Sequence, residues 1–130
     1  MSDVLIIGGG PAGASAATFT ARAGLSTIVI DDDKGMTRRA MLNNHLGFPD
    51  GVTGPDLVDG GRAQAERAGA MWVDGKVEGV DGSAGAFIVR TAEGANYEAS
   101  AVVLATGAVA SLAEAIGIEL KDGTEPHIQR

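Results

Sequence analysis

The sequence contains no cysteine. Disulfide bonds, catalysis by a protein thiolate and metal sites built on cysteine are therefore excluded for these 130 residues. Histidine is also scarce, because His45 and His127 are the only two and lie far apart, with no metal-ligand spacing around either. The sequence therefore predicts no metal centre.

Positive charge and long apolar runs are scarce as well. Ten lysines and arginines stand against seventeen acidic residues, for a formal net charge of −7, and no basic cluster exceeds the pair Arg38-Arg39. We therefore expect no nucleic-acid binding and no binding to an anionic membrane surface. No apolar run approaches the roughly 20 residues of a membrane span, and the first run, residues 4–7, is too short for a signal peptide. These features favour a cytoplasmic protein with one domain over residues 1–130.

Glycine, by contrast, is abundant, and its most informative occurrence follows the apolar residues 4–7. The six residues there are Gly8, Gly9, Gly10, Pro11, Ala12 and Gly13. A Gly-x-Gly-x-x-Gly spacing between a strand and a helix is the fingerprint of dinucleotide binding. The first glycine allows a tight turn, the second lets a pyrophosphate approach the backbone, and the third lets the helix pack closely. The N-terminus of that helix then presents N–H groups to the phosphates.

An acidic residue at the end of the next apolar segment supports this interpretation. Residues 27–30 are apolar or β-branched and lead directly into Asp31, close to the spacing at which such domains place the acid that binds ribose hydroxyls. Asp32 would take that role if the strand ended one residue later. Pro11 is compatible with a first helical turn, and Gly24 predicts the C-cap of the helix. The alternative is a glycine turn without a ligand, and the combined features favour a dinucleotide site.

The remaining pattern predicts short elements. Residues 32–52 are expected to be irregular, and Thr53 to cap a helix over residues 54–68. Turns are expected at Asp81-Gly82 and Glu93-Gly94. Strands are predicted over residues 70–73, 76–80, 85–91, 96–99 and 101–105, followed by a short helix over 111–116. Trp72 and Phe87 are expected in the core of the antiparallel part.

Taken in order along the chain, these motifs resemble the thioredoxin reductase branch of the FAD-dependent pyridine nucleotide oxidoreductases. Besides the glycine motif and Asp31, the resemblance rests on residues 44–55, 65–70, 77–80 and 103–107. It implies an α/β fold, with a doubly wound parallel sheet (a Rossmann-like FAD domain). A small antiparallel β-meander would link the third and fourth parallel strands.

The resemblance also implies FAD as the cofactor and suggests how it is held. The backbone of residues 8–13 would hold the pyrophosphate, and Asp31 the adenosine ribose. Asn44 would lie near the flavin ring, and Val77 would offer its backbone to adenine. Ala105, Thr106 and Gly107 would pack along the cofactor.

For the Arg38-Arg39 pair and for His45 the sequence leaves alternative roles. Arg39, together with Arg38, either neutralises the pyrophosphate or is a solvated loop pair. His45 is a candidate proton donor near the flavin, although its counterpart in the family is usually aromatic. No side chain is assigned a catalytic role, because the cofactor would perform the chemistry.

Three departures from the family pattern shape the expected function. The second, NADPH-binding domain with its Cys-x-x-Cys pair is missing, and the Gly-Gly-Gln after the second strand is replaced around Gly35-Met36-Thr37. The closing strand that ends in Gly-Asp has no counterpart before Arg130. We therefore expect a minimal or truncated FAD domain. A homodimer or a partner complex would cover the apolar edge of residues 101–105.

The sequence favours a flavoprotein that acts as a small oxidoreductase or electron-transfer partner. Its electron donor and acceptor would both be external, since the chain has no thiols of its own. One alternative is a regulatory module that binds NAD(H) or another adenine nucleotide. The other is a non-catalytic remnant of the family. The meander and the residues 105–107 favour FAD over NAD, because a simple NAD domain has no use for them.

Overall fold

The computed structural model describes residues 1–107 and 116–117. Its elements, in chain order, are β1 (Ser2–Ile7), α1 (Pro11–Arg22), β2 (Thr27–Asp31), the 3-10 helix η1 (Met36–Arg39), β3 (Met41–Leu42), β4 (Val52–Thr53), α2 (Gly54–Ala68), β5 (Met71–Asp74), β6 (Val77–Ser83), β7 (Ala86–Thr91) and β8 (Asn96–Leu104). Neither described α-helix is long and apolar enough to cross a membrane.

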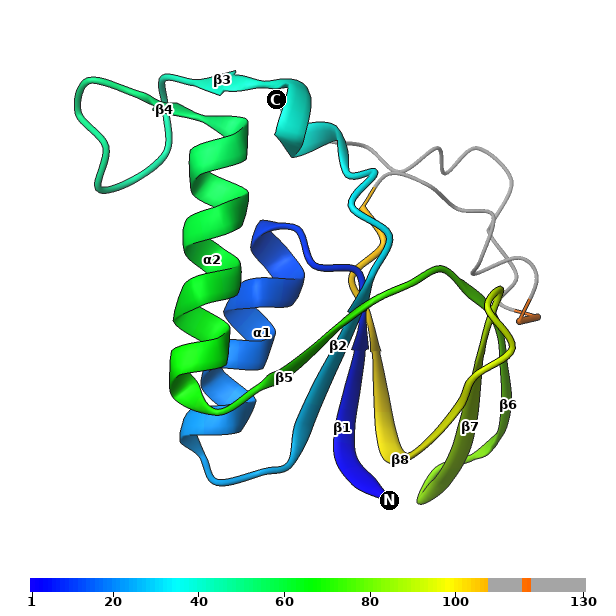
Figure 1. Cartoon of the computed structure of the whole chain (residues 1–130). Helices are drawn as coiled ribbons and strands as arrows, with labels where there is room; N and C mark the ends of the chain where they lie inside the picture. The colour runs from blue at the N-terminus through cyan, green and yellow to red at the C-terminus, as the bar shows by residue number, and fades with distance from the viewer. Residues whose placement is uncertain (108–115, 118–130) are drawn as a thin grey trace.

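The sheet has six strands in the order β5-β2-β1-β8-β7-β6. The pairs β5–β2, β2–β1 and β1–β8 are parallel, whereas β8–β7 and β7–β6 are antiparallel. The antiparallel strands form the meander that links the third parallel strand to the fourth (Figure 1). The predicted fold class is thereby confirmed.

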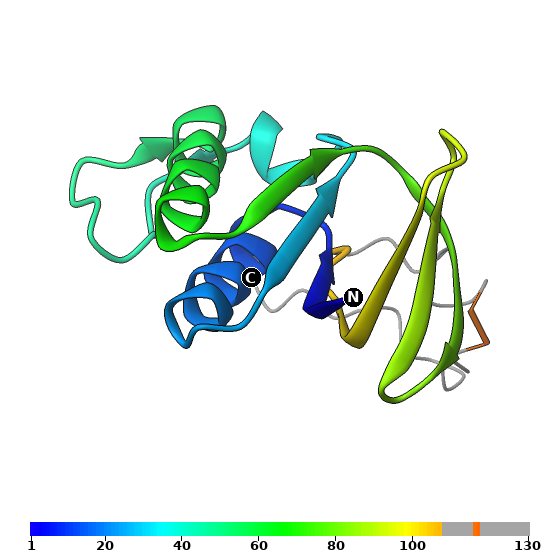
Figure 2. The ribbon, with the colours of Figure 1, turned by 60° about the horizontal axis from the view of Figure 1, so that its bottom comes forward.

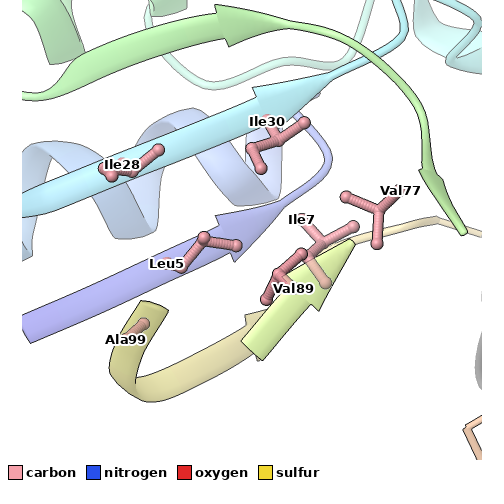
Figure 3. Close-up of a cluster of buried hydrophobic side chains, with 7 residues drawn as sticks. All are labelled: Leu5, Ile7, Ile28, Ile30, Val77, Val89 and Ala99. Carbon is pink, nitrogen blue, oxygen red and sulfur yellow. The ribbon is translucent and has the colours of Figure 1, made fainter. Parts of the chain in front are cut away.

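The two faces of the parallel strands bury different partners, as the alternation of side chains along a strand requires. Val4, Ile6 and Val29 belong to a cluster with Ala17 of α1 and Ala65 of α2, and Figure 2 shows both helices on this side of β5, β2 and β1. The opposite cluster contains Leu5, Ile7, Ile28 and Ile30 together with Val77, Val89 and Ala99 of the meander (Figure 3). The meander therefore covers the face that the two described helices leave open.

Strand β8 belongs to both parts of the sheet. Residues 96–99 pair with β7, and Ala99 and residues 101–104 pair with β1, from Ser2↔Ala99 to Ile7↔Leu104. The sequence predicted separate strands over 96–99 and 101–105, which is wrong. Ser100 continues the strand between the residues that pair with β7 and those that pair with β1, and its carbonyl accepts a hydrogen bond at 2.9 Å from the amide of Gly85, in the turn before β7.

Several local predictions are confirmed. Thr53 caps α2, because its Oγ1 accepts a hydrogen bond from the Asp56 amide at 3.2 Å. The α2 bounds match the expected range, and the Glu93-Gly94 turn lies between β7 and β8. The predicted helix over 111–116 falls on residues that, apart from 116, lie outside the described part of the chain.

Three other predictions were wrong in detail. The C-cap of α1 is Ala23, and Gly24 follows it with φ of +84°. The hairpin between β6 and β7 turns at residues 84–85, because Asp81 and Gly82 stay paired with Ile88 and Phe87. Residues 32–52 also contain η1 and the short antiparallel pair β3–β4.

Candidate dinucleotide-binding site

The glycine turn joins the end of β1 to the start of α1, at the carboxyl edge of the parallel strands. Gly8 has φ of +101°, a conformation that suits glycine, and its amide donates to the Ile30 carbonyl at 2.9 Å. A Cβ at Gly8 would overlap the carbonyl oxygen of Ala105. The first glycine of the motif is therefore required by the fold itself.

The third glycine of the motif, Gly13, is closely packed, whereas the second, Gly10, faces open space. A Cβ at Gly13 would overlap the Gly8 carbonyl oxygen and would lie 3.4 Å from the Ala105 Cβ, so α1 can approach the turn only with glycine there. A Cβ at Gly10 would have no atom within 4 Å. Nothing in the described structure requires glycine at position 10, so the space beside it is available to a ligand.

The N-terminus of α1 opens into this same space. Gly10 is the N-cap residue and no side chain caps the helix. The first residue, Pro11, has no N–H, and the Ala14 amide makes the first helical bond, to the Gly10 carbonyl at 2.9 Å. The amides of Ala12 and Gly13 come before that bond, and such amides, with the positive end of the helix dipole, form an anion site.

Asp31 is the last residue of β2, which confirms the predicted strand frame. One oxygen of its carboxylate, Oδ1, accepts a hydrogen bond from the Gly9 amide at 2.9 Å. This contact between the acid and the turn was not foreseen. Asp32 is exposed and instead accepts a hydrogen bond from the Lys34 amide at 3.1 Å.

The segment Ala105, Thr106 and Gly107 leaves β8 beside the glycine turn. The Ala105 amide donates to the Ile7 carbonyl at 2.8 Å, and Gly107 has φ of +70°. The fold thus brings two motifs from opposite ends of the described chain to one edge. Val77 begins β6, the edge strand on the meander side of the sheet, and its side chain is buried in the core cluster of Figure 3.

Residues of the loop between β2 and α2 lie beside the glycine turn and Asp31. Asp33, with φ of +59°, pairs with the Arg38 guanidinium, whose Nη2 also lies 2.8 Å from Asp59 of α2. Hydrogen bonds to Asp59 and then Asp33 raise the pKa of Arg38 above its ordinary value. Beneath this loop lie a cavity of about 70 Å³ and one of about 20 Å³, the smaller lined in part by Gly10, Asp31 and Arg38.

Two predicted site residues lie apart from this cluster. Arg39 is exposed, and its neighbour Arg38 lines the cavities instead. Asn44 is exposed in the connection between β3 and β4, which Figure 1 shows projecting beyond the end of α2. His45 packs against Phe48 in the same connection, with ring centroids 5.8 Å apart. The roles of Arg39 at the pyrophosphate and of Asn44 near the flavin stay predictions.

Trp72 was misassigned from the sequence. It was expected in the core of the meander, but it lies on β5 and packs with the helix-side cluster. Its ring reaches the position where a Cβ of Gly9 would be. No local signal indicates this contact, because it depends on β5 lying beside β2.

Comparison with known proteins identifies the family of this chain. A profile described as pyridine nucleotide-disulphide oxidoreductase matches residues 2–128. The chain belongs to this family. The family's members are oxidoreductases, and the chain is a thioredoxin reductase-like domain of it, corresponding to the FAD-domain part.

Individual relatives within the family support the same assignment. A thioredoxin reductase from Rickettsia bellii is 43% identical over 112 residues, covering 84% of this chain and 36% of the relative. One from Streptomyces clavuligerus is 41% identical over 114 residues, covering 82% and 35%. This chain therefore spans about a third of the length of these relatives.

Solved structures in the family share the fold. A thioredoxin reductase from Gloeobacter violaceus superposes with a TM-score of 0.77 at 37% identity, covering 82% of this chain and 37% of that one. An atypical thioredoxin reductase from Desulfovibrio vulgaris Hildenborough gives 0.76 at 40% identity, covering 84% and 37%.

Proposed function

We propose that this chain binds FAD at the glycine turn and takes part in flavin-dependent electron transfer. The observation that carries the proposal is the open space beside Gly10, at the uncapped N-terminus of α1 and next to the Asp31 carboxylate. A pyrophosphate must approach the backbone closely and is stabilised by amide donors and by the positive end of a helix dipole, and the ribose hydroxyls need a hydrogen-bond acceptor. FAD, when bound, supplies the redox chemistry, while the chain supplies binding and orientation.

The proposed contacts follow from where the residues lie. The amides of Ala12 and Gly13 would bind the pyrophosphate, and the second carboxylate oxygen of Asp31, Oδ2, would accept from the ribose. Residues 105–107 would pack along the cofactor, since Ala105 already contacts the turn. Adenine recognition by the backbone of Val77 and a role for Asn44 near the flavin remain predictions from the resemblance. Roles for Arg39 at the pyrophosphate and for Asp32 at the ribose remain predictions from their charge and position.

The described residues would leave much of the cofactor uncovered. Cofactor pockets usually measure about 300–1,000 Å³, whereas the cavities here measure about 70 Å³ and 20 Å³. FAD would therefore extend over the open carboxyl edge of the sheet. We propose that an external electron donor and acceptor approach it there, because the chain has no cysteine of its own.

The outer edge of β8 supports a further part of the proposal, a homodimer or a partner complex. Among the described residues, 101–104 pair with β1 on one side, while β7 pairs only as far as Ala99. Leu104 is 36% exposed, and Val102 and Val103 are half-buried. Open apolar edges recruit another strand. Sedimentation should therefore show a dimer or larger species, and a soluble monomer with protected amides at 101–105 would contradict it.

Purification of the full chain tests the cofactor assignment. The proposal expects a yellow protein, or a colourless one that turns yellow with FAD, and release of FAD on denaturation. Tight binding of NADH with no FAD binding would favour the regulatory module. Failure to bind either nucleotide, in a chain that circular dichroism shows to be folded, would favour the remnant. Cytoplasmic location remains a prediction, to be checked by cell fractionation.

A further inference from the structure

The middle residue of the Gly-x-Gly pair has an unexpected neighbour. Gly9 is buried, and a Cβ there would overlap Cζ2 of Trp72 and lie 2.7 Å from its Cη2. The same Cβ would lie 2.8 Å from the Cβ of Asp31. The fingerprint leaves this middle position free, and Gly9 is not among the glycines with positive φ. Neither the motif nor the backbone conformation therefore explains a glycine here, whereas the indole ring, which comes closest, and the Asp31 side chain both do.

The indole ring has a second neighbour, on α2. The Arg62 guanidinium of α2 lies 5.4 Å from the centroid of the Trp72 ring, within the range of a cation–π contact. Arg62 also donates to Glu66 and to Asp74, both at 2.9 Å. These hydrogen bonds, the one to Glu66 first, raise the pKa of Arg62 above its ordinary value, so it stays charged. The ring is thus in contact both with a hydrogen-bonded guanidinium and with the glycine turn.

We propose that Trp72 is a positioning residue for the dinucleotide site, acting through Gly9. The ring supports the turn from below, so the Gly9 amide meets the Asp31 carboxylate at 2.9 Å. Asp31 is in turn aligned for the ribose. The effect on the cofactor rests on the proposed function, whereas the coupling between Trp72 and Gly9 does not.

A double-mutant cycle tests the coupling. In the otherwise wild-type chain, Gly9→Ala should lower FAD affinity by about tenfold, because the new methyl group displaces either the ring or the turn. In a Trp72→Val background, the same substitution should lower FAD affinity by less than about fivefold, because the clash with the ring is gone and only the contact with the Cβ of Asp31 at 2.8 Å remains. Tyr97→Val provides the matched control, since Tyr97 is a half-buried aromatic residue on the other face of the sheet. In the Tyr97→Val background, Gly9→Ala should again lower FAD affinity by about tenfold.

Two readouts that need no cofactor accompany the cycle. Urea unfolding should show that Gly9→Ala destabilises the wild-type chain more than the Trp72→Val chain. Amide exchange at Gly9 should accelerate in Trp72→Val, remain slow in Tyr97→Val, and be largely restored by Trp72→Phe. The exchange measurement decides the case if Gly9→Ala alone does not fold.

The outcomes separate this inference from the proposed function. Equal losses from Gly9→Ala in both backgrounds, or unchanged Gly9 exchange in Trp72→Val, would overturn the positioning role. If no variant binds FAD but urea unfolding and exchange show the coupling, the FAD assignment fails while the support of the turn by Trp72 stands. If urea unfolding and amide exchange show the coupling but the FAD titrations do not, Trp72 supports the turn but does not position the site.

Discussion

Gly10 and Gly13 offer the sharpest test of the site, because a single methyl group should have opposite effects at the two positions. At Gly13 the methyl group overlaps the Gly8 carbonyl oxygen and meets the Ala105 Cβ at 3.4 Å. Overpacking of this kind costs about 1–3 kcal/mol of folding free energy. At Gly10 the methyl group meets no atom within 4 Å, and φ of −69° suits alanine. The folding free energy should there change by less than about 1 kcal/mol.

FAD affinity, measured on the folded fraction, should be lowered more by Gly10→Ala than by Gly13→Ala, the reverse of the order for stability. Gly10→Ala places its methyl group where the pyrophosphate must approach, so affinity should fall by at least about tenfold, or about 1.4 kcal/mol. The folded fraction of Gly13→Ala should lose affinity only to the extent that α1 has shifted. Gly10→Ala is therefore predicted to be stable but deficient in binding, and Gly13→Ala to be unstable.

Urea unfolding and FAD titration, monitored by flavin fluorescence, measure the two quantities on the same preparations. Gly60→Ala is a matched control, because its Cβ also meets no atom within 4 Å and it lies in α2, away from the turn. Wild-type affinity in Gly10→Ala would refute the assignment of this space to the pyrophosphate. Unchanged stability in Gly13→Ala would refute the close packing of α1 on the turn.

Three further outcomes are expected. Asp31→Ala should lower FAD affinity at least about tenfold, because charge-assisted hydrogen bonds contribute about 1.5–3 kcal/mol each, while Asp32→Ala should have little effect; the reverse order in FAD titrations would reassign the ribose contact. Leu5→Ala should destabilise the chain by about 2–5 kcal/mol in urea, because Leu5 is fully buried, whereas Phe19→Ala, at a side chain 76% exposed, should stay within about 0.5 kcal/mol. Hydrogen bonds from backbone amides lower the pKa of Glu93. The contribution of Glu93 to stability is therefore present above its ordinary pKa and disappears as the pH falls through the lowered pKa. Glu93→Gln should flatten this part of the curve of stability against pH, and an unchanged curve would contradict the prediction.

The glycine turn, the Thr53 cap and the strand end at Asp31 could be predicted because each has a signal in the sequence. The turn and the cap depend on a few neighbouring residues, and Asp31 ends an apolar segment at the spacing of the motif. A cap needs a hydroxyl beside the first helical turn, and a tight turn needs glycine at a positive φ. These requirements are the same whatever the rest of the chain does. The fold class followed because these local signals occur in the order that the family shares.

The contacts of Trp72 and Arg38 could not be predicted, because they join segments that only tertiary structure brings together. Trp72 reaches Gly9 only when β5 lies beside β2, and Arg38 reaches Asp59 only when its loop crosses α2. The continuity of β8 through Ser100 has the same origin, since two different neighbouring strands supply its partners. The residue types around Ser100 do not indicate that the strand is continuous there.

The position of β1 between β2 and β8 has a consequence for how the chain folds during synthesis. Val4 pairs with Thr27 on one side and with Ala101 on the other, so the strand made first can complete its pairing only with the last described strand, β8. Until residue 104 leaves the ribosome, one edge of β1 and the apolar side chains of Leu5 and Ile7 lack the meander that covers them. Pairing over such long sequence separations is slow, so the nascent chain exposes an apolar strand with an unpaired edge while residues 8–104 are made. A chaperone that binds extended apolar segments would find its target within the first seven residues.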